Sequence, residues 1–227
     1  MDAPSPDSGF APHGLAEGLI HLASRDPDLA AILAHAGTPR FPLRAPGFPT
    51  LLHIILEQQV SIDAAAAMYR RLRQSCTPLA PSSFLALDDA LLRQCGFSRQ
   101  KMLYGRNLAL RILDGSCALD QLHSMPDEAA MAELVRLKGI GRWSAEVYLL
   151  FALGRPDIWP AQDLGLQLAV QRLSGTAERP GPPALDALAE KWRPWRSVAA
   201  CLLWQFYLHA LGRLREPTAA IAPFTGN

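Results

Sequence analysis

Apolar residues recur along most of this 227-residue chain at the spacing of an amphipathic helix. In the segment FPTLLHIILEQQ they stand at positions 48, 51, 52, 55 and 56, which predicts a helix with one apolar face. Ser61 is a suitable N-cap for the next segment, SIDAAAAMYRRLRQ. Further helices are expected at about 81–87, 88–95 and 98–114, and then in DEAAMAELVRL, WSAEVYLLFALG, DLGLQLAVQRL, PPALDALAEKW and PWRSVAACLLWQFYLHALG.

No segment alternates apolar and polar residues with the β-branched enrichment of a strand, so the predicted fold class is all-α. Near the N-terminus, Asp26 followed by Pro27 predicts the start of a helix, and Gly37 predicts its end. Residues 1–14 and 217–227 show no helical pattern and are expected to be flexible tails.

Composition limits the classes of protein to which the chain can belong. Hydrophobic residues make up 49% and charged residues 19%, a balance typical of a folded globular protein. No apolar run approaches the roughly 20 residues of a membrane span. The first residues lack the pattern of a secretory signal, so a location in the bacterial cytoplasm or nucleoid, without membrane contact, is expected. The four cysteines have neither zinc nor iron–sulfur spacing and are expected to be free and mostly buried.

Two short basic segments contrast with a net charge of only +1. The first runs from Arg93 to Arg111 without an acidic residue, and the second contains Arg136, Lys138 and Arg142. Local positive charge of this kind is typical of nucleic-acid-binding proteins. Solvated helix faces would give the same pattern, so charge alone leaves both interpretations open.

The segment LKGIGR at 137–142 lies between two predicted helices. Gly139 and Gly141 permit a tight hairpin with unusual backbone dihedrals, and they remove the Cβ atoms that would keep a phosphate away from the backbone. Backbone N–H groups beside the start of a helix favour anion binding. Such a contact reads phosphate and not base sequence. The alternative is an ordinary αα-hairpin with a glycine turn.

Asp163 follows the proline-containing turn IWPAQ and starts the next predicted helix. By itself this position suits a plain N-cap residue. Together, however, the glycine hairpin and an aspartate downstream of a proline match a known pattern. The segments LKGIGRWSA and PAQDLGLQLAV resemble the signature of the helix-hairpin-helix (HhH-GPD) DNA glycosylase superfamily.

The resemblance is greatest to bacterial DNA-3-methyladenine glycosylase II (AlkA-like) enzymes, and it extends over roughly residues 48–206. It implies two helical lobes with a helix-hairpin-helix motif and an active site in the cleft between them. Residues 15–47 and 164–216 would form one lobe, and residues 48–163 a helical barrel that contains the hairpin. Only about 45 residues precede the shared region, so a compact form without the N-terminal β domain of the longer enzymes is expected.

By the same resemblance, Asp163 is the catalytic carboxylate, which stabilises the positive charge that develops on the sugar as the base departs. Gln162 stands where the family often has a second acid. Trp143 occupies the place of the lysine with which bifunctional relatives form a Schiff base, so no AP-lyase activity is expected. The expected phosphate-binding residues are Lys138, Gly139, Ile140, Gly141 and Arg142.

Trp143 and Trp204 are expected to line the pocket for the substrate base, because aromatic faces attract cationic alkylated purines. Gln59, with Gln58 beside it, aligns with the wedge that enters the duplex when the nucleotide is flipped. Core packing remains the alternative for Trp143, and a polar helix end remains the alternative for the two glutamines.

The resemblance therefore implies a monofunctional glycosylase that hydrolyses the N-glycosidic bond of alkylated bases, such as 3-methyladenine and 7-methylguanine, in base excision repair. Its expected partner is double-stranded DNA containing alkylated bases, which it would bind as a monomer. No cofactor and no iron–sulfur cluster are expected, although a structural Na⁺ or K⁺ on the carbonyls of Gly139 and Gly141 is considered. The alternatives are a glycosylase for another lesion, a non-catalytic damaged-DNA-binding protein, and an unrelated helical protein.

Overall fold

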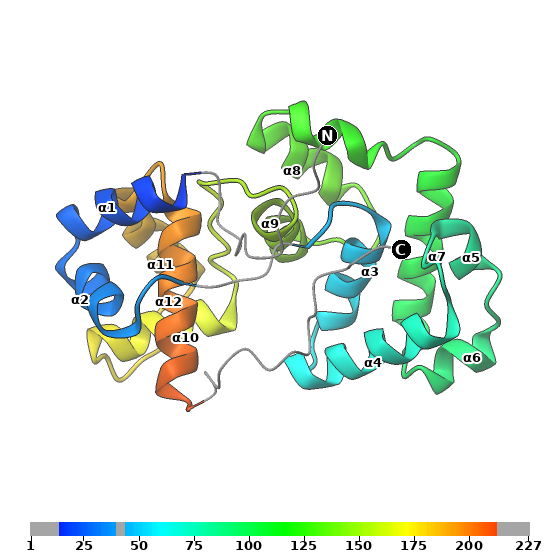
Figure 1. Cartoon of the computed structure of the whole chain (residues 1–227), viewed down its shortest axis with the longest axis horizontal. Helices are drawn as coiled ribbons and strands as arrows, with labels where there is room; N and C mark the ends of the chain where they lie inside the picture. The colour runs from blue at the N-terminus through cyan, green and yellow to red at the C-terminus, as the bar shows by residue number, and fades with distance from the viewer. Residues whose placement is uncertain (1–13, 40–43, 213–227) are drawn as a thin grey trace, which may run out of the picture. The chain divides into compact units, whose positions relative to one another are not determined.

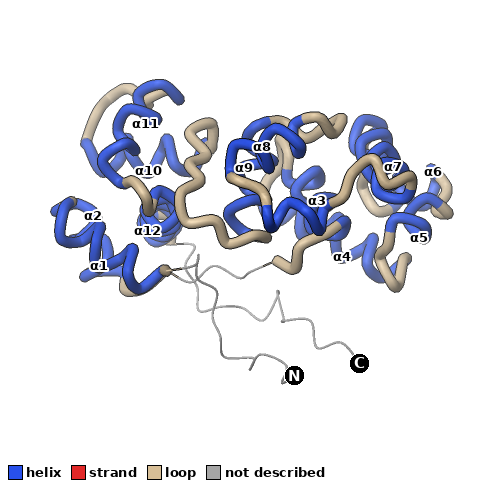
Figure 2. The backbone as a smooth tube through the Cα atoms, turned by 90° about the horizontal axis from the view of Figure 1, so that it is seen from above, coloured by secondary structure: helices blue, strands red, loops and turns tan. Residues whose placement is uncertain are grey.

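The computed structural model describes residues 14–39 and 44–212, and every regular element in these ranges is a helix (Figures 1 and 2). The all-α prediction is therefore confirmed. Apart from Gly14, which is the N-cap of the first helix, the expected tails lie outside the described residues. Within the described ranges, no helix combines the length and the apolarity that crossing a membrane requires.

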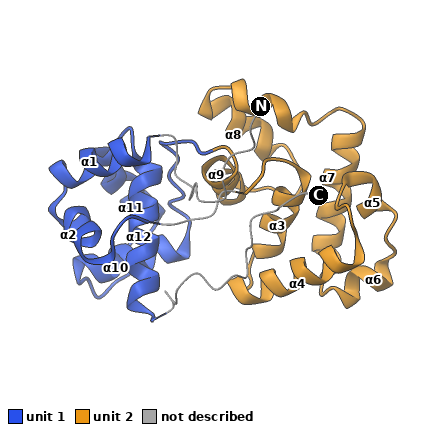
Figure 3. Cartoon of the chain, viewed as in Figure 1, with its two compact units in different colours: residues 1–43, 154–227 blue, residues 44–153 orange. Residues whose placement is uncertain are grey.

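The described chain divides into two compact units, which Figure 3 distinguishes by colour. Unit 2 comprises residues 44–153, and unit 1 comprises the described residues before and after that range. The sequence predicts residues 154–163 in the lobe that contains the hairpin and residues 44–47 in the other lobe, whereas the structure places 154–163 in unit 1 and 44–47 in unit 2. Asp163 therefore belongs to the unit whose helices follow it in the chain.

Unit 1 is built around α12 (Arg196–Ala210), which packs against α1 (Leu15–Arg25), α2 (Pro27–Ala36) and α10 (Leu164–Ser174). The unit also contains α11 (Pro182–Ala189) and the short 3₁₀ helix η2 (Glu190–Trp192). Most of α12 is buried, and the side chains of Val198, Ala199, Ala200 and Leu203 are inaccessible to solvent.

Asp26 starts α2 as the sequence predicted, and it also joins distant parts of unit 1. Its Oδ1 accepts hydrogen bonds from the backbone N–H groups of Asp28 and Leu29, while its Oδ2 accepts from the indole of Trp192 at 2.7 Å. Lys191 Nζ lies 2.8 Å from the same Oδ2. Burial by itself would raise the pKa of Asp26, but the hydrogen bonds from Lys191 and Trp192 outweigh it, so that pKa is lowered.

Unit 2 is built around α3 (Phe48–Glu57), which packs against α4 (Ile62–Ser75), α7 (Arg99–Leu113) and α9 (Arg142–Phe151). The remaining elements are α5 (Pro81–Leu85), α6 (Asp89–Gln94), the 3₁₀ helix η1 (Leu119–Ser124) and α8 (Asp127–Val135). The sequence predicted one apolar face for α3, but the helix is buried on most of its circumference, since Ile54 is also inaccessible. Helices on several sides explain the difference, and each buried aliphatic side chain contributes roughly 1.5–3 kcal/mol.

The predicted N-cap at Ser61 is confirmed, because its side chain accepts a hydrogen bond from the N–H of Ala64. Ser98 caps α7 in the same way. All four cysteines are free, and three of them are buried, as expected from their scattered positions.

Candidate active site

Asp163 is the N-cap of α10, and the local chain fixes its carboxylate. Its Oδ1 accepts a hydrogen bond from the backbone N–H of Leu166 at 2.9 Å, and its own N–H donates to the carbonyl of Pro160 at 2.9 Å. Gln167, one turn further along α10, donates from its amide to the carbonyl of Ala161. These hydrogen bonds join the proline turn to the start of α10 and hold the carboxylate in a half-exposed position.

Trp204, on α12, contacts the same carboxylate directly. Its indole Nε1 donates a hydrogen bond to Oδ1 of Asp163 at 2.8 Å. The sequence predicted only an aromatic face for this tryptophan, whereas the structure shows that it also orients Asp163. Gly165 permits this approach, since a Cβ at that position would lie 3.0 Å from Asp163 Oδ1 and 3.3 Å from Trp204 Cδ1.

The start of α12 holds the turn that precedes Asp163. Arg196 Nε donates to Asp157 Oδ1 at 2.8 Å, and its Nη2 donates to Asp157 Oδ2 at 2.9 Å. Ser197 Oγ donates to the carbonyl of Arg155 at 2.6 Å and accepts from the N–H of Ile158 at 2.9 Å. The same helix therefore anchors the turn and supplies Trp204, which makes the position of Asp163 depend on α12 at two points.

The glycine hairpin joins α8 to α9 in unit 2. Gly139 has a φ of +92°, in the region that favours glycine, and a Cβ there would run into the ring of Tyr104 on α7. Gly141 differs from the sequence-based expectation, because its φ of −86° and ψ of 177° describe ordinary extended backbone. No heavy atom lies within 4 Å of where its Cβ would stand, so Gly141 leaves the backbone at the N-terminus of α9 open to an approaching group.

The predicted phosphate-binding side chains differ in their surroundings. Lys138 is exposed and projects from the hairpin, whereas Ile140 is buried and anchors the hairpin in unit 2. Arg142 Nε lies 2.8 Å from Oε1 of the buried Glu146, one turn along α9. Arg142 is therefore held by an ion pair, although its own side chain remains 64% exposed.

The two glutamines of the expected wedge have different environments. Gln58 turns inward, and its Nε2 donates to the carbonyl of Gly139 at 2.8 Å and to Ser144 Oγ at 2.9 Å. Gln59 is exposed, and its φ of +56° makes it the one non-glycine residue with positive φ in the described chain. The structure therefore supports Gln59 as a wedge candidate and gives Gln58 a different contact, with the hairpin.

Trp143 lies in the first turn of α9, directly after the hairpin, and is half-exposed. Trp159 and Trp192, by contrast, are buried and pack edge to face with ring centroids 5.3 Å apart. The accessible surface of Trp143 distinguishes it from these structural tryptophans and is compatible with contact to a base.

The basic segment from Arg93 to Arg111 is partly engaged within unit 2. Lys101 Nζ donates to the carbonyls of Leu56 and Gln58, and Arg106 Nη2 donates to the carbonyl of Leu87 and to Asp89. These contacts hold two of the five basic side chains of the segment within unit 2, so the segment does not present all of its charges to solvent.

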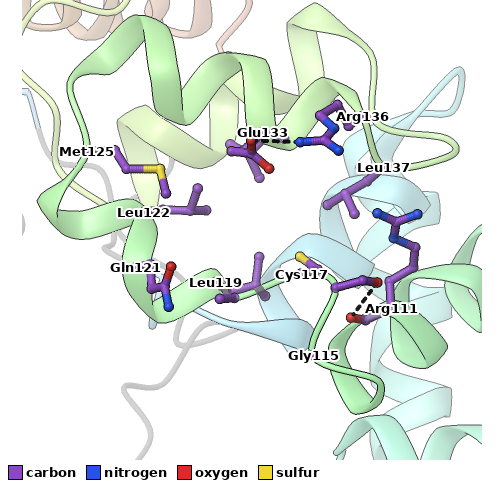
Figure 4. Close-up of a pocket in the computed structure, with 13 residues that line it drawn as sticks. Arg111, Gly115, Cys117, Leu119, Gln121, Leu122, Met125, Glu133, Arg136 and Leu137 are labelled. Atoms are coloured by element: carbon purple, nitrogen blue, oxygen red, sulfur yellow. Dashed lines mark hydrogen bonds and ion pairs between the residues drawn. The ribbon is translucent and has the colours of Figure 1, made fainter.

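A pocket of about 280 Å³ lies where the end of α7 meets η1 and α8 (Figure 4). Arg111, Cys117, Leu122 and Leu137 are among the residues that line it. Burial raises the pKa of Cys117, which keeps this thiol protonated at neutral pH. The pocket does not contain any of the residues expected to contact the substrate base.

The geometry of the Asp163 turn and of the glycine hairpin agrees with the protein family that the sequence matches. Residues 52–194 match the HhH-GPD superfamily of base excision DNA repair proteins. Because the match covers more than half of its length, the chain belongs to this family.

Individual relatives extend the comparison. The chain is 29% identical over 203 residues to an alkylbase DNA glycosidase-like protein of Schizosaccharomyces pombe, covering 85% of this chain and 94% of the relative. It is 30% identical over 190 residues to DNA-3-methyladenine glycosylase 2 of Escherichia coli, covering 76% of this chain and 63% of that enzyme. The crystal structure of a DNA-3-methyladenine glycosidase from Bacillus halodurans superposes with a TM-score of 0.73 at 29% identity, covering 93% of this chain and 95% of the other.

Proposed function

We propose that the protein is a monofunctional DNA glycosylase that hydrolyses the N-glycosidic bond of alkylated purines in base excision repair. The observation that carries the proposal is the carboxylate of Asp163, which the backbone of Leu166 and the indole of Trp204 hold in one orientation. Both hydrogen bonds go to Oδ1, so the carboxylate is fixed before any substrate binds. A group fixed in advance avoids reorganisation during the reaction, which is the main source of electrostatic catalysis.

The chemistry suits a single carboxylate. As the C1′–N bond lengthens, positive charge grows on the sugar, and a negative charge beside C1′ stabilises it. A water molecule then adds to C1′ and loses a proton, for which the Asp163 carboxylate can serve as acceptor. Alkylation at N3 or N7 makes the purine cationic and therefore a good leaving group, so modest stabilisation of the sugar is sufficient.

The residues near the hairpin argue against strand cleavage. Nicking by bifunctional enzymes requires an amine that attacks C1′ and forms a Schiff base. Trp143 offers no amine at the start of α9, and Lys138 precedes the turn at Gly139. We therefore propose that water is the nucleophile and that the product is an intact strand with an abasic site.

Recognition of the damaged base is assigned to the aromatic residues. Trp143 and Trp204 each offer a half-exposed ring on which a cationic purine can stack, and such a cation–π attraction contributes on the order of 0.5–2 kcal/mol. An undamaged purine is neutral and gains less. Gln59 would fill the space that the flipped nucleotide leaves, and its amide can bond the orphaned partner base.

DNA binding is assigned to the hairpin, with the protein acting as a monomer on double-stranded DNA. The exposed Lys138 and the open backbone at Gly141 would contact a phosphate. The carbonyl oxygens of Gly139 and Gly141 are neutral oxygen ligands of the kind that suits Na⁺ or K⁺. Each accepts one hydrogen bond, from Gln58 and from Ala145 respectively, and a carbonyl oxygen has a second lone pair for an ion that bridges to the phosphate.

A panel of defined duplexes tests the proposal. Duplexes carrying 7-methylguanine, 3-methyladenine, 1,N⁶-ethenoadenine, hypoxanthine or uracil are incubated with the protein, and free base and strand nicks are measured separately. We expect the cationic methylated purines to be released fastest, because they bind the aromatic faces best and leave most readily. Release of uracil alone would contradict the assigned specificity, and duplex binding without release of any base would identify a damage-binding protein.

A further inference from the structure

The end of α3 is held by a half-buried cation from α7, Lys101. Lys101 Nζ donates to the carbonyl of Leu56 at 2.6 Å and to the carbonyl of Gln58 at 2.9 Å. Carbonyls at a helix C-terminus lack helical hydrogen-bond partners and carry partial negative charge. An ammonium group there donates the missing hydrogen bonds and supplies the opposite charge. Burial lowers the pKa of Lys101, while the nearby Glu57 opposes that shift.

Both carbonyls belong to residues that lie just before Gln59 in the chain. The carbonyl of Gln58 belongs to the peptide bond that leads directly into Gln59, whose φ of +56° is unfavourable for a residue with a side chain. Such a conformation persists when surrounding contacts determine it. Lys101 is the side chain that fixes the peptide on the N-terminal side of Gln59.

The same helix also meets the hairpin. Tyr104 lies one turn after Lys101 on α7, and its ring occupies the space where a Cβ of Gly139 would stand. Gln58 closes the arrangement, since its side chain bonds the carbonyl of Gly139 while its own carbonyl is bonded by Lys101. The wedge candidate and the phosphate-binding hairpin are therefore tied to one helix and to each other, all within unit 2.

We propose that Lys101 is a positioning residue for base flipping: it holds the turn at Gln59 ready for insertion at a fixed distance from the hairpin that binds the phosphate. This role rests on the proposed glycosylase function. A wedge ordered in advance loses little conformational entropy on entering the duplex. Lys101 thus acts through Gln59 and does not touch the reacting bond.

The test compares two settings of the same lesion. In a fully paired duplex the wedge must unpair and unstack 7-methylguanine, whereas in a bulge the base has no partner and leaves the stack at a lower free-energy cost. For Lys101→Met we expect single-turnover release from the paired site to fall about tenfold or more, the size of effect that follows from losing charge-assisted hydrogen bonds. Release from the bulge should stay within about twofold of the wild-type rate, and Lys101→Arg, which keeps a cation at this position, should recover part of the loss.

A matched control lies on the same helix. Arg106 also donates to backbone carbonyls, those of Leu85 and Leu87, but at the connection between α5 and α6. Arg106→Met should lower the thermal midpoint without separating the paired from the bulged substrate. An equal loss on both substrates in Lys101→Met would show a merely structural role and overturn the proposal, as would no loss on either.

A second readout does not depend on chemistry. A 2-aminopurine placed beside the lesion brightens when the stack opens, and we expect Lys101→Met to reduce this increase at saturating protein, with Lys101→Arg restoring part of it. If the wild-type protein opens the stack but releases no base, the proposed function fails while the positioning role is still measured. A full increase in Lys101→Met would contradict the positioning role.

Discussion

Replacing Asp163 with asparagine is expected to lower single-turnover base release by at least about 100-fold, the scale found when one preorganised electrostatic group is removed from an active site. Asparagine is also a good N-cap, and its Oδ1 can accept the same hydrogen bonds from Leu166 and Trp204. The substitution therefore removes the charge and leaves the local structure in place. Rates are measured on a duplex with one 7-methylguanine, and affinity is measured on the same duplex.

Asp88 provides the control for this substitution. It is likewise an N-cap, and its Oδ1 accepts from the N–H of Leu91 at 2.7 Å at the start of α6. Asp88→Asn should release the base at the wild-type rate. An Asp163→Asn protein that binds the duplex and retains full activity would show that another group supplies the catalysis.

Replacing Gly139 with alanine is expected to cause the second large effect, a loss of DNA binding together with a loss of stability. The new methyl group would enter the space of the Tyr104 ring, and the φ of +92° would strain any residue with a Cβ. Left-handed backbone costs roughly 1–2 kcal/mol, and overpacking costs typically about 1–3 kcal/mol more. Thermal unfolding and binding to an undamaged duplex measure the two losses.

Gly115 separates these two causes within the same unit. Its φ is +74°, but no heavy atom lies within 4 Å of its Cβ position. Gly115→Ala should therefore show only the backbone cost, with DNA binding unchanged. If Gly139→Ala were no more destabilising than Gly115→Ala, the contact with Tyr104 would not shape the hairpin.

Features that depend on neighbouring residues in the chain could be predicted from the sequence. Asp26 and Ser61 were recognised as N-caps because a capping side chain bonds an N–H two or three residues ahead. Asp163 follows the same rule, and the family pattern gave this cap its expected role. The all-α class followed equally from local periodicity.

Contacts between distant residues could not be predicted in this way. The hydrogen bond from Trp204 to Asp163 spans 41 residues, and that from Gln58 to Gly139 spans 81. No periodicity or motif spacing encodes such pairs. Lys101 shows the same limit, because a lysine in a basic segment suggests a solvated charge, and only the packing of α7 on α3 brings it to the carbonyls at the end of α3.

Hydrolysis by a fixed carboxylate proceeds without a covalent protein–DNA intermediate. The most direct test is a single-turnover reaction on a 7-methylguanine duplex in the presence of sodium cyanoborohydride, which reduces any Schiff base to a stable adduct. We expect free 7-methylguanine in an amount equal to the abasic sites formed, with no protein attached to DNA. A trapped adduct that grows with base release would contradict this mechanism.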